Sequence, residues 1–289
     1  MKRIRTSGIC AFALIFIAAA VLSAQAPQEK SVNVFGAKIN YVEAGDPAKP
    51  KVILLHGLGG SIANWAMNTS AIAQNYHVFA LDQVGFGKSE KPALKYRVGT
   101  YVDFLDKFMA ELKIEKASLV GNSMGGWVAA WTAIKYPNRV EKIVLADAAG
   151  IVPANFSETQ IYQLNNSTRD EIRANMKLIF ATPALQNNEA LVDQFMTARV
   201  TAGDGGTINA LIESIKRRED SLNGRLGEIK KPTLIIWGKQ DGLLPLADAY
   251  TFNKGVAGSE LLVFEQTGHV PQFEKAADFN KAVLAFLAK

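Results

Sequence analysis

One stretch constrains the chain more than any other: residues 119–126, an apolar run that ends in Gly-Asn-Ser-Met-Gly-Gly. The pattern predicts a buried strand, a very tight turn and the first turn of a helix, with Ser123 at the tip of the turn. Gly121 and Gly125 flank the serine, and glycine leaves such a turn uncrowded because it has no Cβ. Ser123 is therefore a candidate nucleophile, which needs a base, an acid and oxyanion donors from other parts of the chain.

Residues 1–24 differ in kind from the rest of the 289-residue chain. Lys2, Arg3 and Arg5 precede an apolar run over residues 9–22, and small residues follow it, which is the layout of a secretory signal peptide. We therefore expect residues 1–24 to be cleaved and the mature chain to be periplasmic or secreted. If it is not cleaved, the run is instead an N-terminal membrane anchor.

Removal of this segment changes the charge and the cysteine content. The segment holds three basic residues and no acidic ones, so the formal net charge falls from +5 to +2, and no basic face for nucleic acid is predicted. Cys10, the single cysteine, leaves with the segment. The mature chain then has no disulfide, cysteine nucleophile or thiolate metal ligand.

Downstream of this segment, short apolar runs alternate with helical stretches. Strands are expected at residues 32–36, 38–43, 52–55, 77–81, 117–121, 140–145, 233–237 and 260–264, and a helix is expected around residues 62–74. Continuous Val, Ile and Leu runs separated by amphipathic helices are typical of a parallel sheet covered on both faces, so the expected fold class is α/β. The first two strands surround a Gly-Ala turn and are expected to form a hairpin at the sheet edge.

A long helical stretch without a convincing strand interrupts this alternation at residues 150–227. Ligands of open α/β sheets bind beyond the carboxyl ends of the strands, where this insertion emerges. We therefore expect a helical cap over a core domain made of residues 25–149 and 228–289. A separate helical domain with no bearing on the site is the alternative.

The chain offers three histidines as a base for Ser123. His269 lies in a loop after the last predicted strand, at the same edge of the sheet as the serine, and completes the chain order Ser, Asp, His. His56 precedes a glycine-rich loop and is interpreted as a brace for it. His77 begins a strand and is interpreted as a surface or strand-end residue. His269 is the predicted base.

The acid that orients this histidine is predicted to be Asp241, which follows a strand end and precedes His269 in the chain. Asp147, after the strand over residues 140–145, is the rival. Asp82 also ends a strand, but the sequence that follows it indicates a structural turn.

Two backbone N–H groups are predicted to bind the oxyanion. The Met124 N–H directly follows the nucleophile at a helix N-terminus, and the Leu58 N–H lies in the glycine-rich loop of residues 56–60. A dinucleotide or phosphate cradle is the alternative reading of that loop, but Ile62 stands where its third glycine is required and no Walker Gly-Lys-Ser/Thr follows.

Five motifs occur in the order of a known fold. They are residues 56–60 (HGLGG), 82–89 (DQVGFGKS), 121–126 (GNSMGG), 237–241 (WGKQD) and 268–271 (GHVP). On these motifs, residues 30–289 resemble the α/β-hydrolase fold, a mostly parallel sheet with helices on both faces and a helical cap inserted between strands. Asn122 and residues 145–150 (LADAAG) are similar to bacterial lipases and esterases that also resemble monoacylglycerol lipases.

The GNSMGG stretch also occurs in carbon–carbon bond hydrolases that act on aromatic ring-fission products. Those enzymes often carry an aromatic residue directly after the catalytic histidine, where this chain has Val270. They also use a cap arginine for a substrate carboxylate, and the candidates here are Arg169, Arg173 and Arg199.

The resemblance implies an exported serine hydrolase that cleaves carboxylic esters, either small acyl esters or monoacylglycerols, through an acyl-enzyme. Hydrolysis of a vinylogous diketone is the alternative, and a catalytically silent domain used for binding is a third hypothesis. No cofactor or metal is expected, since the chain has no HExxH motif and no cysteine framework. The expected partner is a small-molecule ester, with transient lipid contact through the cap and no nucleic acid.

Overall fold

The computed structural model describes residues 26–153 and 164–289. An eight-stranded sheet in the order β1-β2-β4-β3-β5-β6-β7-β8 forms its centre. The strands are β1 (Gln28–Val34), β2 (Ala37–Ala44), β3 (Lys51–Leu55), β4 (His77–Leu81), β5 (Ala117–Asn122), β6 (Val140–Ala146), β7 (Thr233–Gly238) and β8 (Glu260–Phe264). The β1–β2 and β2–β4 pairings are antiparallel and the other five are parallel. The predicted hairpin thus forms one edge of the sheet, and the predicted α/β fold class is confirmed.

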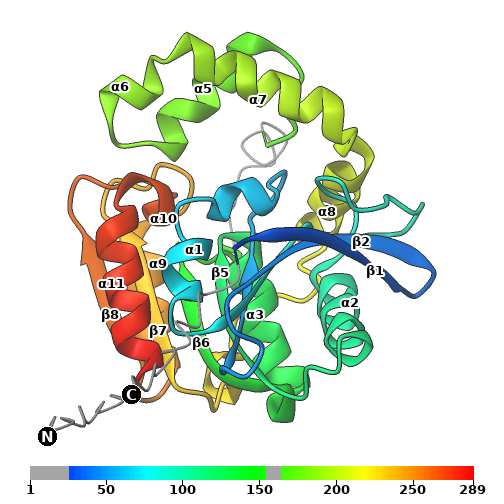
Figure 1. Ribbon diagram of the computed structural model, residues 1–289. Coiled ribbons are helices and arrows are strands. Elements are labelled where there is room, and N and C mark those ends of the chain that lie inside the picture. Colours follow the sequence, from blue (N-terminus) through cyan, green and yellow to red (C-terminus); the bar gives the residue numbers. More distant parts are fainter. Residues whose placement is uncertain (1–25, 154–163) are drawn as a thin grey trace, which may run out of the picture.

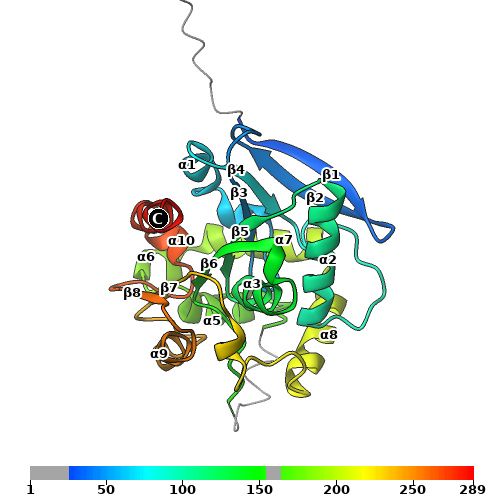
Figure 2. The same cartoon turned by 90° about the horizontal axis from the view of Figure 1, so that it is seen from below.

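Both faces of the inner parallel strands are buried, whereas the edge strand β8 is partly exposed. In β3, Ile53 and Leu55 belong to the core under one face, and Val52 and Leu54 to the core under the other, because side chains alternate along a strand. The first face is covered by α2 (Val98–Glu111), α3 (Met124–Lys135) and α9 (Leu246–Gly255), and the second by α1 (Thr69–Ala73) and α11 (Ala276–Leu287) (Figure 2). This two-sided cover explains why the strands are almost continuously apolar.

The stretch that reads as one helix over residues 62–74 is two short elements, the 3-10 helix η1 (Ile62–Trp65) and α1. Asn68 lies between them, and its Nδ2 donates to the Gln272 carbonyl at 3.1 Å and to Asn280 Oδ1 at 2.8 Å. These contacts attach the chain to α10 (Pro271–Glu274) and α11. A tertiary contact therefore interrupts the helix that local pattern predicts.

The chain between β6 and β7 is helical. It contains α5 (Arg169–Ile179), α6 (Pro183–Gln186), α7 (Glu189–Ala202), α8 (Gly205–Lys216) and the 3-10 helix η3 (Leu226–Glu228), and a further 3-10 helix, η2 (Pro137–Arg139), precedes β6. Figure 1 shows α5, α6 and α7 beyond one end of the strands. These three helices share a small apolar core around Met176, Phe180 and Val192. We refer to residues 150–227 as the helical insertion; the domain boundaries proposed from the sequence stay predictions.

The predicted signal peptide, with Cys10, lies outside the described residues. Within residues 26–153 and 164–289, no helix combines the length and the apolar character needed to cross a bilayer. Export and anchoring through residues 1–24 both stay predictions.

Candidate active site

Ser123 stands on a sharp turn between β5 and α3. Its backbone has φ 55° and ψ −120°, a combination that non-glycine residues rarely adopt. A Cβ on Gly121 would lie 2.2 Å from the Gly125 carbonyl oxygen, and one on Gly125 would lie 2.1 Å from the Leu55 carbonyl oxygen. Both flanking positions therefore require glycine, and the turn presents a partly exposed serine where α3 begins.

His269 and Asp241 form a pair on neighbouring loops. His269, in the loop after β8, holds its Nδ1 2.7 Å from Oδ2 of Asp241, in the loop after β7. Asp241 Oδ1 accepts further hydrogen bonds from the N–H groups of Leu243 and Leu244, at 2.8 and 3.0 Å. With Nδ1–H donating to the carboxylate, Nε2 of the ring is left to accept a proton.

Asn122 joins the Ser123 turn to the His269 loop. Its Nδ2 donates to the His269 carbonyl oxygen at 3.0 Å and to the Ala146 carbonyl oxygen at 3.2 Å. Within the described part of the chain, the Ser123 hydroxyl makes no hydrogen bond to the His269 ring. Such bonds are often long in unliganded sites and tighten when substrate binds. The sequence marks Asn122 only as part of a motif and gives no signal for this bridging contact.

The glycine-rich loop after β3 lies against Ser123. A Cβ on Gly57 would be 3.1 Å from Ser123 Cβ, a closer contact than ordinary packing allows. Leu58 follows in this loop, and Met124 is the first residue of α3, where backbone N–H groups have no partner within the helix. The two N–H groups predicted to bind an oxyanion therefore belong to the two segments next to Ser123.

His56 uses both ring nitrogens to hold this loop. Its Nδ1 lies 2.7 Å from the Gly57 carbonyl oxygen, and its Nε2 accepts from the Gln83 N–H at 3.0 Å, so the ring proton is on Nδ1. Burial lowers the pKa of His56 and keeps the ring neutral. His77 lies at the start of β4 with its Nε2 2.8 Å from Glu43 Oε1, and it is buried rather than on the surface. Neither ring contacts Ser123 in the described residues.

Asp82 organises the turn that follows β4. Its Oδ1 accepts from the Ile62 N–H at 2.7 Å, and its Oδ2 from the Lys88 N–H at 2.9 Å. A Cβ on Gly87 would lie 2.3 Å from Asp82 Cγ, so the loop wraps closely around the carboxylate. These contacts fit the structural turn indicated by the sequence.

Asp147, the rival acid, lies behind Asp241 and forms no hydrogen bond with His269. Its side chain is fully buried, and Oδ1 accepts from the Gly238 N–H at 2.9 Å. Burial, and then the charge of Asp241, raises the pKa of Asp147 well above its usual range. One atom each of Asp147, Asp241 and His269 lie within 4.8 Å of one another, a spacing that also suits a metal ion. Asp241 Oδ2 and His269 Nδ1 are already hydrogen-bonded to each other.

Glu274, an acidic residue that lies in none of the five sequence motifs, links the His269 loop to the helical insertion. Its Oε2 accepts from the Gly268 N–H at 2.6 Å. Its Oε1 accepts from the N–H groups of Ala181 and Thr182, both at 3.0 Å, and from the Thr182 hydroxyl at 2.8 Å. The only signal in the sequence is that Glu274 follows His269 by five residues.

The carboxyl end of α5 accepts hydrogen bonds from the loops of both candidate triad residues. The Leu178 carbonyl accepts from the Gly242 N–H at 3.0 Å, and the Ile179 carbonyl from the His269 N–H at 2.7 Å. These are carbonyls that a helix end leaves unpaired. A Cβ on Gly268 would lie 2.2 Å from the Ile179 oxygen. The helical insertion therefore packs directly on the candidate site.

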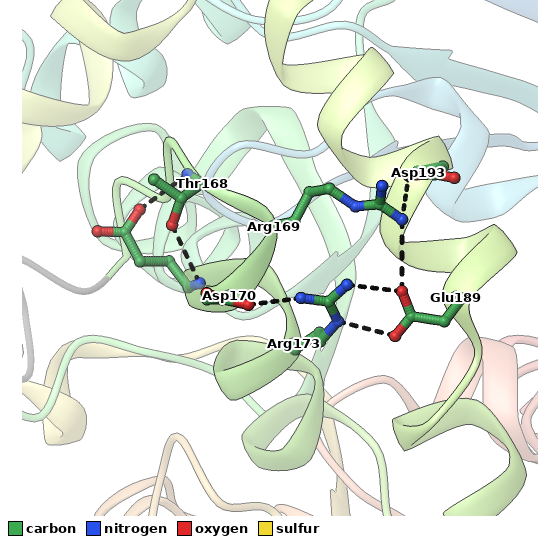
Figure 3. A network of polar contacts seen from close by, with 7 residues as sticks. Thr168, Arg169, Asp170, Arg173, Glu189 and Asp193 are labelled. Carbon is green, nitrogen blue, oxygen red and sulfur yellow. Dashed lines mark hydrogen bonds and ion pairs between the residues drawn. The ribbon is translucent and has the colours of Figure 1, made fainter.

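Two of the arginines proposed to bind a carboxylate lie on the side of α5 that faces α7, here called its outer side. Figure 3 shows Arg169 and Arg173 reaching from α5 to α7. Arg173 binds both oxygens of Glu189 through Nε and Nη2, at 2.7 Å each. Arg169 Nη2 lies 2.8 Å from Asp193 Oδ1. Both guanidinium groups are thus engaged between the two helices.

Arg199 lies beside the glycine-rich loop, since a Cβ on Gly59 would be 3.4 Å from its Nη1. Its Nη1 pairs with the buried carboxylate of Asp204, and its Nη2 donates to Asn165 Oδ1 at 2.6 Å. Its Nε donates to the Asn166 carbonyl oxygen at 3.4 Å. All three of its nitrogens therefore have partners within the protein.

Comparison with known proteins points to one fold family. The sequence profile of the alpha/beta hydrolase fold matches residues 50–276. The chain is 34% identical over 254 residues to the dihydrolipoyllysine-residue acetyltransferase component of the acetoin cleaving system of Cupriavidus necator, covering 86% of this chain but only 66% of that protein. It is 32% identical over 247 residues to the 2-hydroxymuconate semialdehyde hydrolase of a Pseudomonas species, covering 82% and 87% of the two chains. A solved membrane phospholipase A, described as a bacterial virulence factor, is 30% identical with a TM-score of 0.80, covering 91% and 86%.

Proposed function

Because the chain belongs to the alpha/beta hydrolase family, we propose that it is an exported serine hydrolase that cleaves carboxylic esters through an acyl-enzyme. The single observation that carries the proposal is the pairing of His269 with Asp241 beside a serine held at φ 55° on a glycine-flanked turn. Ser123 is the nucleophile, His269 the base and Asp241 the residue that orients the base.

The proposed reaction begins when Ser123 Oγ attacks the ester carbonyl and His269 Nε2 takes its proton. The Leu58 and Met124 N–H groups donate to the oxyanion of the tetrahedral intermediate, aided by the positive end of α3. His269 then gives the proton to the departing alcohol and activates a water that hydrolyses the acyl-enzyme. The cycle requires no metal or other cofactor.

The relatives include both an ester-cleaving and a carbon–carbon-cleaving enzyme, so hydrolysis of vinylogous diketones is a second candidate function. The 32% identity to the Pseudomonas semialdehyde hydrolase favours it. Two observations favour esters instead. Arg169, Arg173 and Arg199 are each paired with acidic residues, and Val270 occupies the position where the carbon–carbon hydrolases often carry an aromatic residue.

We propose small acyl esters or monoacylglycerols as substrates, since the insertion packs an apolar cluster around Phe180, Phe195 and Val270, next to His269. Exposed Leu178 and Val200 on the insertion and exposed Phe273 on α10 support transient contact with lipid. No nucleic-acid partner is proposed.

The decisive experiment is a panel of p-nitrophenyl esters of rising acyl length, assayed alongside one ring-fission diketone. We expect hydrolysis of the esters and none of the diketone. Ser123→Ala is expected to lower kcat by about 10⁴-fold or more, whereas Ser70→Ala, an exposed substitution on α1, leaves it unchanged. Cleavage of the diketone alone would replace the proposal with the second candidate. A chain that cleaves neither and is not labelled at Ser123 by a fluorophosphonate would be a silent binding domain.

A further inference from the structure

The buried carboxyl group of Asp147 has no part in the reaction described above, yet it lies against the proposed triad. Asp147 follows β6 with its backbone at φ 43°, an unfavourable value for a residue with a Cβ. Its Oδ2 is buried and receives no hydrogen bond from the described residues. The Asp147 and Asp241 carboxyl groups and the His269 ring lie within 4.8 Å of one another. An unpartnered oxygen so close to a carboxylate requires an explanation.

The two carboxyl groups differ in the donors around them. Asp241 accepts three hydrogen bonds, from Leu243 N–H, Leu244 N–H and the His269 ring. Asp147 accepts one, from the Gly238 N–H. When two carboxyl groups share a dry site, the one with fewer donors keeps the proton. The negative charge therefore belongs on Asp241, where it stabilises the imidazolium.

The charged groups that face Asp147 also favour the protonated, neutral form of its carboxyl group. Asp241 and, to a smaller extent, Glu274 disfavour a second negative charge, and together with burial they raise the pKa of Asp147 well above its usual range. Only the Gly238 N–H favours the charged form among the contributions to this shift. His269 becomes a cation only when it has accepted a proton.

We propose that Asp147 is a positioning residue that carries a proton and donates a hydrogen bond from Oδ2 to the carboxylate of Asp241. The chain of hydrogen bonds then runs from Asp147 through Asp241 to His269, the proposed base for Ser123. The contact holds the Asp241 carboxylate toward His269 and draws part of its charge away from the ring. The role of this contact in the reaction rests on the proposed function, whereas the protonation of Asp147 and its hydrogen bond to Asp241 do not.

Asp147→Asn keeps a hydrogen-bond donor next to Asp241 but removes the proton that can titrate. The amide has an oxygen that accepts from the Gly238 N–H and an NH₂ that donates to Asp241, and it does not titrate. We expect Asp147→Asn to keep kcat within about threefold near neutral pH and Asp147→Ala to lose about 10- to 100-fold in kcat with little change in KM, as for other residues that orient a reacting group. The wild type should lose activity as pH rises through the raised pKa of Asp147, and the Asn variant should not. Equal losses in both variants would overturn the proposal.

Stability against pH gives a readout that does not depend on catalysis. A carboxyl group whose pKa is raised by folding stabilises the fold fully below its unfolded pKa of about 3.9, and this contribution disappears as pH rises through the folded pKa. Relative to wild type, Asp147→Asn should therefore become progressively more stable as pH rises above about 4. Parallel stability curves would show that Asp147 is ionised in the folded protein and would refute the inference.

Asp248→Asn is the matched control, because burial and the charge of Asp241 raise the pKa of Asp248 to about 6 while it lies outside the Asp147 cluster. Relative to wild type, its stability should change only between about pH 4 and pH 6 and then level off. If no ester is hydrolysed but the Asp147 curves diverge as expected, the proposed function fails alone. If esters are hydrolysed and the curves stay parallel, the inference about Asp147 fails alone.

Discussion

Helix α5 is held in two different ways at its carboxyl end and on its outer side. At the carboxyl end, the Leu178 and Ile179 carbonyls accept N–H groups from the loops of Asp241 and His269, and Glu274 adds four further hydrogen bonds to the same junction. On the outer side, long and partly exposed side chains form ion pairs with α7 (Figure 3). The first attachment consists of hydrogen bonds to backbone groups, whose positions the fold restricts. The second consists of long side chains that are flexible and partly exposed to water.

We expect the first attachment to affect the proposed reaction and the second to affect mainly the stability of the insertion. Exposed ion pairs contribute about 0–1 kcal/mol each, because water screens them and ordering two long side chains costs entropy. Backbone hydrogen bonds at a close-packed junction fix the positions of the atoms they join. We therefore expect changes at the carboxyl end of α5 to alter the reaction and changes on its outer side to alter little.

The largest effect is expected from Gly268→Ala. The new Cβ would lie 2.2 Å from the Ile179 oxygen and 2.9 Å from the Ala181 nitrogen, so the loop that carries His269 has to move. A displacement of about 1 Å at a catalytic group can lower the rate about 100-fold, and overpacking destabilises by about 1–3 kcal/mol. Ester hydrolysis and thermal unfolding measure the two effects. Gly206→Ala is the control, since its Cβ would meet nothing within 4 Å.

A smaller effect is expected from Glu274→Gln. The amide keeps one acceptor oxygen but presents an NH₂ group either to the Gly268 N–H or to the N–H groups of Ala181 and Thr182, so part of the junction is lost. We expect kcat to fall about 10-fold with KM nearly unchanged, and amide hydrogen exchange to rise on both sides of the junction. Glu260→Gln, which removes only a surface pair with Lys289, should change neither quantity. A rise in KM alone would assign Glu274 to substrate binding instead.

The smallest effect is expected from Arg173→Ala. The substitution removes the contacts with Asp170 and Glu189, which are screened by water, so unfolding should become only slightly easier. The difference from wild type should shrink as salt is added, and ester hydrolysis should stay within about twofold. A loss of activity comparable to that of Gly268→Ala would show that the outer side of α5 also positions the site, and would remove the distinction between the two attachments.

Features that depend on local pattern were predictable from the sequence. The strands and the turn at Ser123 follow from apolar runs and from glycines at fixed spacing. The structure also joins Asp241 to His269 and places the glycine-rich loop beside Ser123. The role assigned to each of these residues stays a prediction.

Features that depend on contacts between distant segments were not predictable. Asn68 lies where the predicted helix is divided. Its hydrogen-bond partners are more than 200 residues away in the chain, so no local pattern discloses the break. Glu274 and Asn122 act through backbone groups, which any sequence provides, so their residue types alone do not disclose their partners. For Asp147, the sequence leaves it and Asp241 as rival acids at strand ends, and only packing shows that Asp241 accepts from the His269 ring while Asp147 accepts from the Gly238 N–H.

The contact between Asn122 and His269 spans 147 residues of chain, and this separation orders events during folding. Closing so long a loop is slow compared with forming the β5–α3 turn. We therefore expect the turn of Ser123, the proposed nucleophile, to form early, and the loop of His269, its proposed base, to be placed only after β7, β8 and the intervening helices. An incompletely folded chain would then carry Ser123 without its proposed base, and we expect hydrolysis only once the last part of the sheet has assembled.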